Sequence, residues 1–526
     1  MKGQLHHPSI MLRRISQKIK TTLSWIENTP LPFSYFLLTF VFAITLRNFL
    51  EAYFTGEIQD ANFSSTLFHY YIFYVFLAMT LVILCHYATR ETVVKISRII
   101  LPSFLILILN PILSLAVPAW RSFSTGYAFP DTHHNLLYGF LTFFGPLYPS
   151  GASPAMRVEI GLALILIFIY FHIKKHLLLR SLLFTFLTYT VIYSYGCVPF
   201  MFDSFMRVFG LKAELLLPPM TNFYLLCFFP LGVWLFYLYD RKSFHEILKD
   251  ARWTTLLRFL HYEMMFAFGI VLSEILYEKP MRLTSENLFP LIFSILAIFF
   301  ACLYSLMTNN SADQDIDVVT NHQKPSVTKS IDPITYHAIS WSVLGLAVLY
   351  SWAAGVIYLF LILLFIGNYF LYSMPPIRFK RVPFFSKILI SLNCLVIILL
   401  GYYFHGGHFD VPLNVVGFFL LWVTAALNFI DLKDYEGDKK AGIKTLPVIF
   451  GLEKSKIIIG IFFLMAYGQT IWISKRIEFC LLMVGVGIVQ YFLINRKNYN
   501  EKPVFIVYLL SMLALIIFIR RIYFPA

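Results

Sequence analysis

Charged residues are scarce in this chain. Asp, Glu, Lys and Arg make up 13% of its 526 residues, whereas hydrophobic residues make up 59% and the mean hydropathy is +0.72. About a quarter of the residues of a soluble globular domain are charged, so this composition excludes that class. Apolar runs of about 20 residues, the length needed to cross a hydrocarbon core, recur from end to end. The sequence therefore predicts an all-α polytopic membrane protein.

Cysteine is scarce as well. The chain has six cysteines, which are scattered and form no CxxC pair. This spacing argues against a disulfide framework or a cysteine-based metal site, and it predicts buried free thiols. The first apolar run, 33–54, is too long for a signal peptide and lacks a small-residue cleavage site, so we expect a retained first span.

The apolar runs divide into two groups, separated by the charged segment "YDRKSFHEILKDARWTTLLR". We expect about six helices in a first region, 1–245, and about nine in a second, 246–526. The expected spans are 33–54, 67–87, 97–117, 156–173, 179–199, 220–239, 257–277, 287–307, 334–353, 355–373, 387–404, 413–430, 455–473, 477–495 and 504–522.

Two predicted outer loops, "EAYFTGEIQDANFSS" and "YYFHGGHFDVP", contain no Lys or Arg, whereas the alternate loops are rich in both. This asymmetry predicts that the N-terminus and the Asp-rich loops are cytoplasmic. We expect the plasma (inner) membrane of a prokaryote as the location. The formal net charge of +14 does not indicate a nucleic-acid partner, because the basic residues lie in short clusters between apolar runs. We expect membrane lipids as the surroundings.

Carboxylates gather at the end of one predicted span. Asp313, Asp315 and Asp317 follow the apolar run "LIFSILAIFFACLYSLMT" directly. If the helix continues, Asn309, Asp313 and Asp317 stand at i, i+4 and i+8 and share one face. Asp315 then points the other way.

A second acidic segment, "DLKDYEGDKKAGIKTLPVIFG", ends another predicted span on the same side of the membrane. Its Asp431, Asp434 and Asp438 stand at i, i+3 and i+7, again on one helical face. One acidic helix end is often only a solvated cap, but two on the same side favour a site. Like charges at this spacing repel, and desolvation near a membrane adds to the cost, so a cation is expected between them.

Oxygen ligands with no nearby His or Cys suit Mg²⁺, which keeps waters and also binds substrate phosphate oxygens. Lys433 lies within the second segment, and Lys324 and Lys329 follow the first. Such cations would offset the charge that develops on a leaving diphosphate.

The two segments resemble the signatures of the UbiA superfamily of intramembrane prenyltransferases. "NNSADQDID" resembles the first signature, NDxxDxxxD, and the second segment resembles DxxDxxxD with its Gly-Ile-Lys-Thr-Leu-Pro tail. Between them, "YSMPPIRFKR" (372–381) resembles the family's helix-four exit segment. The resemblance covers about 250 to 526. Asn310 replaces the usual Asp, and Lys324-Pro325 replaces the usual Arg-Pro.

The resemblance implies a nine-helix, Mg²⁺-dependent prenyltransferase that transfers an isoprenoid group from a prenyl diphosphate to a lipophilic or aromatic acceptor, which stays unidentified. It implies that the ion is bound by Asn309, Asp313, Asp317, Asp431, Asp434 and Asp438. It implies catalytic roles for Asp313, Asp317, Asp434, Asp438, Lys433 and Tyr372, and substrate binding by Asn309, Lys324, Lys329, Lys380 and Asp431.

Two alternatives stay open. One is a membrane transporter or lipid-handling protein, which predicts charged residues within the membrane. Arg47, Glu159 and Glu274 are such residues, although each lies near a span end. The other is a non-catalytic relative of the same superfamily, for which Asn310 is the argument. The first 240 residues resemble nothing that assigns them a role.

Overall fold

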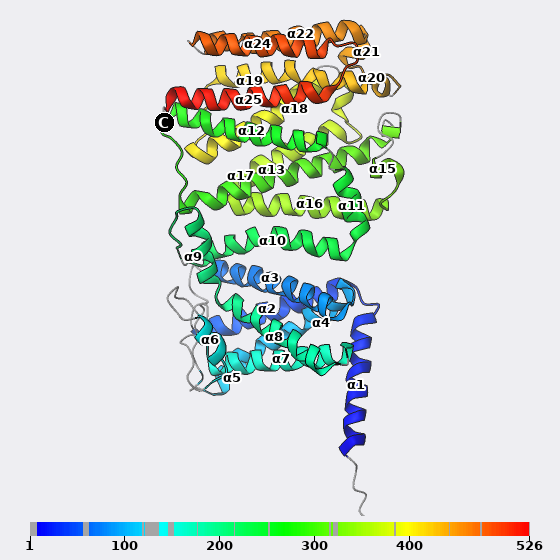
Figure 1. Ribbon diagram of the computed structural model, residues 1–526, viewed down its shortest axis with the longest axis vertical. Helices are drawn as coiled ribbons and strands as arrows, with labels where there is room; N and C mark the ends of the chain where they lie inside the picture. Colours follow the sequence, from blue (N-terminus) through cyan, green and yellow to red (C-terminus); the bar gives the residue numbers. More distant parts are fainter. Residues whose placement is uncertain are drawn as a thin grey trace, which may run out of the picture. The chain divides into compact units, whose positions relative to one another are not determined.

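The computed structural model describes residues 8–55, 63–117, 120, 136–145, 152–175, 177–214, 216–250, 253–314, 317–318, 324–382, 385–440, 442–473 and 476–524. These residues divide into two compact units, 1–241 and 242–526. Helices dominate both units, and the described residues contain no strand. The fold class predicted from composition is thereby confirmed (Figure 1).

The N-terminal unit is built from ten α-helices and one short 3-10 helix among its described residues. They are α1 (Pro8–Asn28), α2 (Phe33–Thr55), α3 (Phe63–Thr89), α4 (Val93–Ser103), η2 (Phe104–Ile108), α5 (Leu109–Ala116), α6 (Leu136–Thr142), α7 (Pro154–Lys175), α8 (Leu178–Gly196), α9 (Val198–Val208) and α10 (Leu217–Tyr239). Its largest cluster of buried apolar residues is contributed by α2, α3, α4, α7, α8 and α10.

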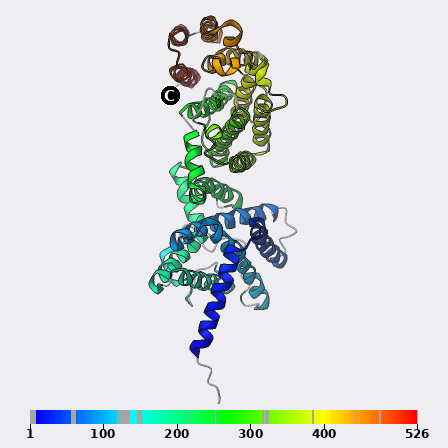
Figure 2. The same cartoon turned by 90° about the vertical axis from the view of Figure 1, so that its right-hand side faces the viewer.

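The C-terminal unit follows, with α11 at the boundary. Its elements are α11 (Arg241–Asp250), α12 (Trp253–Leu276), α13 (Ser285–Ala312), α15 (Pro325–Thr328), α16 (Pro333–Ala354), α17 (Val356–Ser373), η4 (Phe379–Arg381), α18 (Phe385–Gly406), α19 (Leu413–Ala426), η5 (Leu427–Ile430), α20 (Asp431–Lys440), α21 (Leu446–Phe450), α22 (Leu452–Gly468), α23 (Thr470–Ile473), α24 (Ile477–Ile494) and α25 (Glu501–Tyr523). Within this unit α22 and α24 pack together at one edge (Figures 1 and 2).

Thirteen helices of the described chain are long and apolar enough to cross a membrane. A further pair, α8 and α9, passes the same test together but is bent by 65°. The expected span 455–473 corresponds to α22, which has 17 residues, and the four-residue α23. The multi-pass membrane architecture predicted from hydropathy is therefore confirmed.

Local sequence explains where α13 begins. The Thr284 side chain accepts a hydrogen bond from the backbone N–H of Asn287, and the Asn287 side chain accepts one from the backbone N–H of Thr284. This reciprocal cap satisfies two donors that a helix start leaves unpaired. From there α13 runs 28 residues to its acidic end.

Small residues let α12 and α18 approach backbone to backbone. A methyl group on Gly269 would clash with the carbonyl of Ile398, and one on Gly401 would clash with the carbonyl of Phe266. Close approach at glycines is a common way for helices to associate in lipid, where burial of apolar surface supplies little driving force. This contact lies at the centre of the C-terminal unit.

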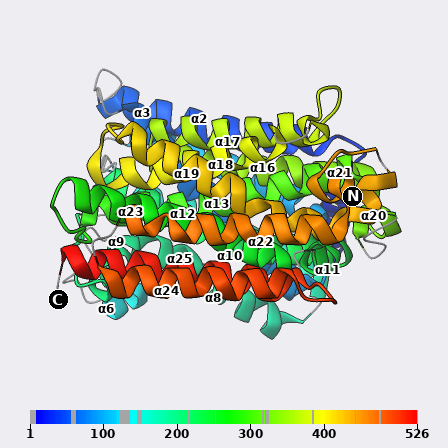
Figure 3. The ribbon, with the colours of Figure 1, turned by 90° about the horizontal axis from the view of Figure 1, so that it is seen from above.

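The acidic segments lie at one end of this unit. The span formed by α19, η5 and α20 runs without a break from Val415 to Lys440, so the polar α20 extends directly from an apolar helix. The short helices α15, α20 and α21 lie at the same end of the long helices (Figure 1), and Figure 3 shows α20 and α21 there from above.

Candidate functional site

The first acidic segment does not continue α13 as one helix. The helix ends at Ala312, and Asp313 is its C-terminal cap. Backbone hydrogen bonds of 2.9 Å from Asp313 N–H to Asn309 O and of 2.8 Å from Asp317 N–H to Asp313 O keep these three residues one helical turn apart, so their shared face stays a prediction. Asn309 lies in the last turn, where its Oδ1 accepts a hydrogen bond of 2.9 Å from Ser373 Oγ at the end of α17. Asp315 lies outside the described residues.

Asp313 is buried and bound by two cations. Its Oδ1 accepts a hydrogen bond of 2.7 Å from Arg378 Nη2, and Lys380 Nζ contacts the same oxygen. Arg378 Nη2 also donates to the carbonyl oxygen of Ala312 at 3.0 Å, so it caps the helix that presents Asp313. Burial lowers the pKa of Lys380, and the charge of Asp313 opposes that shift.

Asp317 is held by a different cation. Lys324 Nζ donates to Asp317 Oδ2 at 2.7 Å and to Asn310 Oδ1 at 2.8 Å, so this lysine bridges the two residues. Asn310, the departure from the family signature, thus bonds to the lysine that replaces the usual arginine. Lys329 is exposed and has a left-handed backbone, with φ of 53°.

The second acidic segment forms α20, as its spacing predicts. Asp431 and Asp438 are each 8% exposed, and Asp434 is half-buried. Lys387 Nζ, itself buried, donates to Asp431 Oδ1 at 2.5 Å. Neither Asp434 nor Asp438 forms a salt bridge with a described residue. Among the residues that the structure describes, two of the three carboxylates therefore have no paired cation.

Lys433 and Tyr372, both predicted to be catalytic, occupy different surroundings in the structure. Lys433 is 42% exposed at its side chain, and its Nζ donates a hydrogen bond of 2.9 Å to Glu501 at the start of α25. Tyr372, at the end of α17, lies close enough to Asp313, Asp431 and Asp438 to feel their charges.

The structure adds basic residues that the motif analysis did not select. Arg378 and Lys387 each bind a carboxylate of the predicted site. Arg378 lies within the segment 372–381, in which Lys380 is the one basic residue with a role predicted from sequence. A lone lysine within the apolar run "FSKILISLNCLVIILL" was the signal for Lys387, because a charge placed in a membrane helix is costly without a partner.

The side chains of this site offer oxygen donors only, from five carboxylates and one amide. That set matches the preference of Mg²⁺ and contains none of the nitrogen or sulfur ligands that zinc or copper select. Within the described residues no three Asp, Glu, His or Cys side chains lie close enough together to hold an ion. Lysine and arginine side chains bind three of the carboxylates instead. The oxygen ligands of the site therefore fit Mg²⁺, although lysine and arginine side chains neutralise three of the carboxylates in this structure.

Comparison with protein families gives a match for the C-terminal half. Residues 281–513 match the sequence model described as the UbiA prenyltransferase family, and no family model matches the N-terminal half. The sequence-based resemblance is therefore confirmed for the part of the chain that carries both acidic segments.

Several characterised proteins are similar to this half. The digeranylgeranylglyceryl phosphate synthases of Pyrococcus horikoshii and Methanobrevibacter smithii are 28% and 31% identical over 176 and 180 residues, which cover 33% and 32% of this chain and 61% of each relative. The protoheme IX farnesyltransferase of Aliivibrio salmonicida is 24% identical over 262 residues, 46% of this chain and 88% of its own. The chain thus spans about three-fifths of the length of the synthases.

A solved structure of a UbiA homolog from Archaeoglobus fulgidus bound to GPP and Mg²⁺ is 21% identical, with a TM-score of 0.42. The alignment covers 54% of this chain and 100% of that protein.

Proposed function

We propose, from the match of residues 281–513 to the UbiA prenyltransferase family, that this chain is an integral-membrane prenyltransferase. It would transfer an isoprenoid group from a prenyl diphosphate to a lipophilic or aromatic acceptor. The observation that carries the proposal is the convergence of both acidic segments, with their bound lysines and arginine, at one end of the matching unit. Anionic and cationic groups together suit a metal-bound diphosphate.

The carboxylates are proposed to hold Mg²⁺. Asn309, Asp313 and Asp317 would provide ligands from the first segment, and Asp431, Asp434 and Asp438 from α20. Asp434 and Asp438 are available without displacing a salt bridge to any described residue, which favours them as the first ligands. Mg²⁺ bound there supplies positive charge that stabilises the diphosphate as it leaves.

The basic residues are proposed to bind the diphosphate oxygens. Lys324, Lys380 and Arg378 already pair with the carboxylates, which supports them as the groups that would meet a phosphate bound between the segments. Arginine matches phosphate geometry with two parallel donors. Lys329 is exposed beside this region, and Lys433 is bonded to Glu501, so we assign both a weaker role.

An aromatic row leads from the site into the helices. Tyr372 contacts Tyr369, with ring centroids 6.2 Å apart, and the hydroxyls of Tyr369 and Tyr262 are 2.6 Å apart. Tyr262 packs edge-on against Phe365 at 5.0 Å. When the carbon–oxygen bond to diphosphate breaks, both electrons leave with the diphosphate, and these ring faces would stabilise the allylic cation. The surrounding bundle excludes water until the acceptor captures the cation and releases a proton.

The acceptor and the membrane side belong to the same proposal. The relatives are named for different products, a glyceryl phosphate lipid and a haem, so similarity does not select one acceptor. We place the N-terminus and both acidic segments on the cytoplasmic side, because the loops there carry the Lys and Arg residues. A prokaryotic plasma membrane is the proposed location.

The test uses purified full-length protein in nanodiscs with labelled prenyl diphosphates of graded chain length and a membrane lipid extract. Diphosphate release is measured with Mg²⁺ and with excess chelator, beside Asp313→Ala and Asp434→Ala. Glu436→Ala, an exposed carboxylate on the same α20 helix, is the matched control. We expect release that needs Mg²⁺ and falls by on the order of 100-fold in both Asp variants but not in the control.

The product in the extract would then name the acceptor. Donor binding that depends on Mg²⁺ but gives no turnover with any extract would support a non-catalytic relative. Absence of metal-dependent binding for every donor would contradict the proposal and favour a transporter or lipid-handling protein.

A further inference from the structure

The N-terminal unit contains a cavity that the proposed prenyltransferase site does not use. Its volume is about 360 Å³, and its walls come from α1, α2, α3, α4, η2, α5, α7 and α8. Binding sites for small molecules commonly fall between about 300 and 1,000 Å³. All lining residues belong to the N-terminal unit, so the cavity is complete within that unit.

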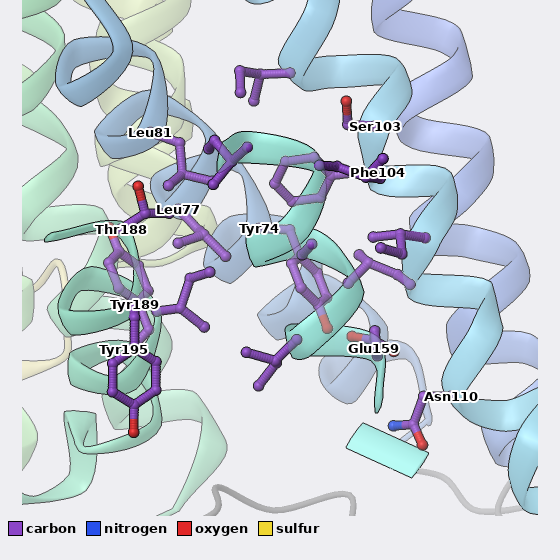
Figure 4. A pocket seen from close by; sticks show the side chains of 18 of the residues that line it. Tyr74, Leu77, Leu81, Ser103, Phe104, Asn110, Glu159, Thr188, Tyr189 and Tyr195 are labelled. Carbon is purple, nitrogen blue, oxygen red and sulfur yellow. The ribbon is translucent and has the colours of Figure 1, made fainter. Parts of the chain in front are cut away.

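The cavity lining is mostly apolar, with Ser103 and Thr188 among the apolar side chains of one end (Figure 4). Leu77, Leu81 and Phe104 lie toward one end, and Glu159 and Asn110 lie toward the other (Figure 4). Aliphatic and aromatic side chains make up most of the lining. A ligand that fills this space therefore needs a long apolar part and a small polar head.

Most of the polar groups along the lining already have partners. Ser103 Oγ donates to the carbonyl of Ile99 at 2.6 Å, and Thr188 Oγ1 donates to the carbonyl of Phe184 at 2.8 Å. The Tyr195 hydroxyl lies 2.6 Å from Thr80 Oγ1. These groups do not require a ligand.

Glu159 and Arg47 differ from these groups in their hydrogen bonding. Both are at least nine-tenths buried, with exposures of 7% and 6%. Arg47 Nη2 pairs with Glu51 at 2.8 Å, and its guanidinium stacks over the rings of Tyr70 and Tyr74, 5.6 Å from each centroid. Among the described residues, however, Arg47 Nε and Glu159 Oε2 have no hydrogen-bond partner.

The unpaired atoms are one donor and one acceptor in the same cavity lining. Arg47 and Glu159 lie close enough to interact electrostatically, and the Tyr74 hydroxyl points toward the Glu159 carboxylate (Figure 4). A buried carboxylate oxygen and a buried guanidinium N–H are each costly without a partner. Ionisable groups of this kind inside a membrane helix commonly mark a functional site.

The chemistry selects the head group of the ligand. With Glu51 and Glu159 beside a single guanidinium, an anionic head would meet an excess of negative charge. An ammonium head donates to Glu159 but offers no acceptor to Arg47, whereas a hydroxyl group does both.

We propose that the cavity of the N-terminal unit binds an uncharged lipid with one long apolar chain and a hydroxyl head. The hydroxyl donates a hydrogen bond to Glu159 Oε2 and accepts one from Arg47 Nε, and the chain lies along Leu77, Leu81 and Phe104. This site is independent of the acidic segments of the C-terminal unit.

The test uses full-length protein in nanodiscs and three photoreactive probes, each with a 16-carbon chain bearing a diazirine. The heads are an alcohol, its methyl ether and a carboxylate. Cross-linked peptides are mapped by mass spectrometry with and without unlabelled hexadecanol. We expect the alcohol to label cavity-lining peptides about tenfold more than the ether does, the difference that one hydrogen bond produces.

Two variants distinguish binding of the head group from binding of the apolar chain. Glu159→Leu should lower alcohol labelling of the lining about tenfold and leave ether labelling unchanged. Ala163→Phe, which fills the cavity, should abolish labelling of the lining by every probe. If Ala163→Phe does not give folded protein, Ile167→Trp serves the same purpose on the same helix.

Equal labelling by alcohol and ether in the unmodified protein would overturn the proposed head group. Labelling that spreads over the lipid-facing helices, and that a cavity-filling variant does not reduce, would overturn the site itself.

Discussion

Ion pairs restrain the acidic residues of the proposed prenyltransferase site one by one. Asp313 is held by Arg378 and Lys380, and Asp431 is held by Lys387. A buried charge that loses its partner is strongly destabilising, whereas removal of both charges is often neutral. These lysines and this arginine therefore act on stability as well as on the charge presented to a substrate.

We expect Lys387→Met to lower the free energy of unfolding by about 3–5 kcal/mol, because Asp431 is left buried without its cation. The double variant Lys387→Met/Asp431→Asn should recover most of that loss, yet lack one proposed Mg²⁺ ligand. Thermal unfolding in detergent measures the effect, with Lys454→Met, an exposed lysine on α22, as control. Equal losses in the single and the double variant would contradict the assignment.

At the scale of helices, one contact in each unit joins elements that are distant in sequence. In the C-terminal unit, Gly269 and Gly401 allow α12 and α18 to touch backbone to backbone. In the N-terminal unit, Lys174 at the end of α7 binds Glu27 of α1 at 2.7 Å and Glu91, between α3 and α4, at 2.8 Å. Three elements thus meet at one ammonium group.

For the glycine contact, we expect Gly401→Ala to destabilise the protein by about 1–3 kcal/mol, since the added methyl meets the Phe266 carbonyl and the helices must move apart. Gly367→Ala on α17 is the matched control, because a methyl group there meets no atom within 4 Å. Unfolding midpoints of the two variants provide the comparison. A larger loss of stability for Gly367→Ala than for Gly401→Ala would contradict the expected role of the contact between α12 and α18.

For the Lys174 contact, stability should depend on pH. The hydrogen bond from Lys174 holds the pKa of Glu91 below its ordinary value of 4.5, so the folded state binds this proton less tightly than the unfolded state. The stabilisation is complete above pH 4.5 and disappears as the pH falls through the lowered value. Glu91→Gln should therefore be less stable than the parent protein at pH 7 and converge with it in acid.

Unfolding midpoints between pH 7 and about pH 3 test this convergence. Glu214→Gln, an exposed carboxylate of the same unit, is the control and should follow the parent protein throughout. A constant difference between Glu91→Gln and the parent protein across the range would exclude titration of Glu91 as the cause.

At the scale of the whole molecule, the chain has two units, each with its own group of buried charged residues. The acidic segments belong to the C-terminal unit, and the buried Arg47 and Glu159 belong to the N-terminal unit. We propose that these are separate domains, one of the UbiA prenyltransferase type and one for lipid binding. Both domains belong to one membrane-spanning chain, so the membrane side of each loop follows from the number of spans between them.

We expect the loop containing Lys329 and the loop containing His408 to lie on opposite sides of the membrane, because the first also carries Lys324 whereas the second lacks Lys and Arg. Lys329→Cys and His408→Cys, both at exposed positions, are labelled with an impermeant maleimide in right-side-out and inverted vesicles. The parent protein is the control, since its six free cysteines are buried or half-buried. Labelling of both variants from one side would refute the orientation.

The sequence by itself determined the membrane class, most of the spans and the two acidic segments, because hydropathy, loop charge and helical spacing are properties of neighbouring residues. It also identified Asp431, Asp434 and Asp438 as one face of a helix, which α20 confirms. It did not predict that α13 ends at Ala312, whose carbonyl accepts a hydrogen bond from Arg378, 66 residues further along the chain.

Only the tertiary structure decided which cation meets which carboxylate. Lys387 and Asp431 are 44 residues apart in sequence, and Lys433 bonds to Glu501 instead of to its neighbours on α20. The cavity beside Arg47 and Glu159 was equally hidden, since α2 and α7 carry those residues more than a hundred positions apart. Local patterns specify elements, but packing between distant elements brings their charges together.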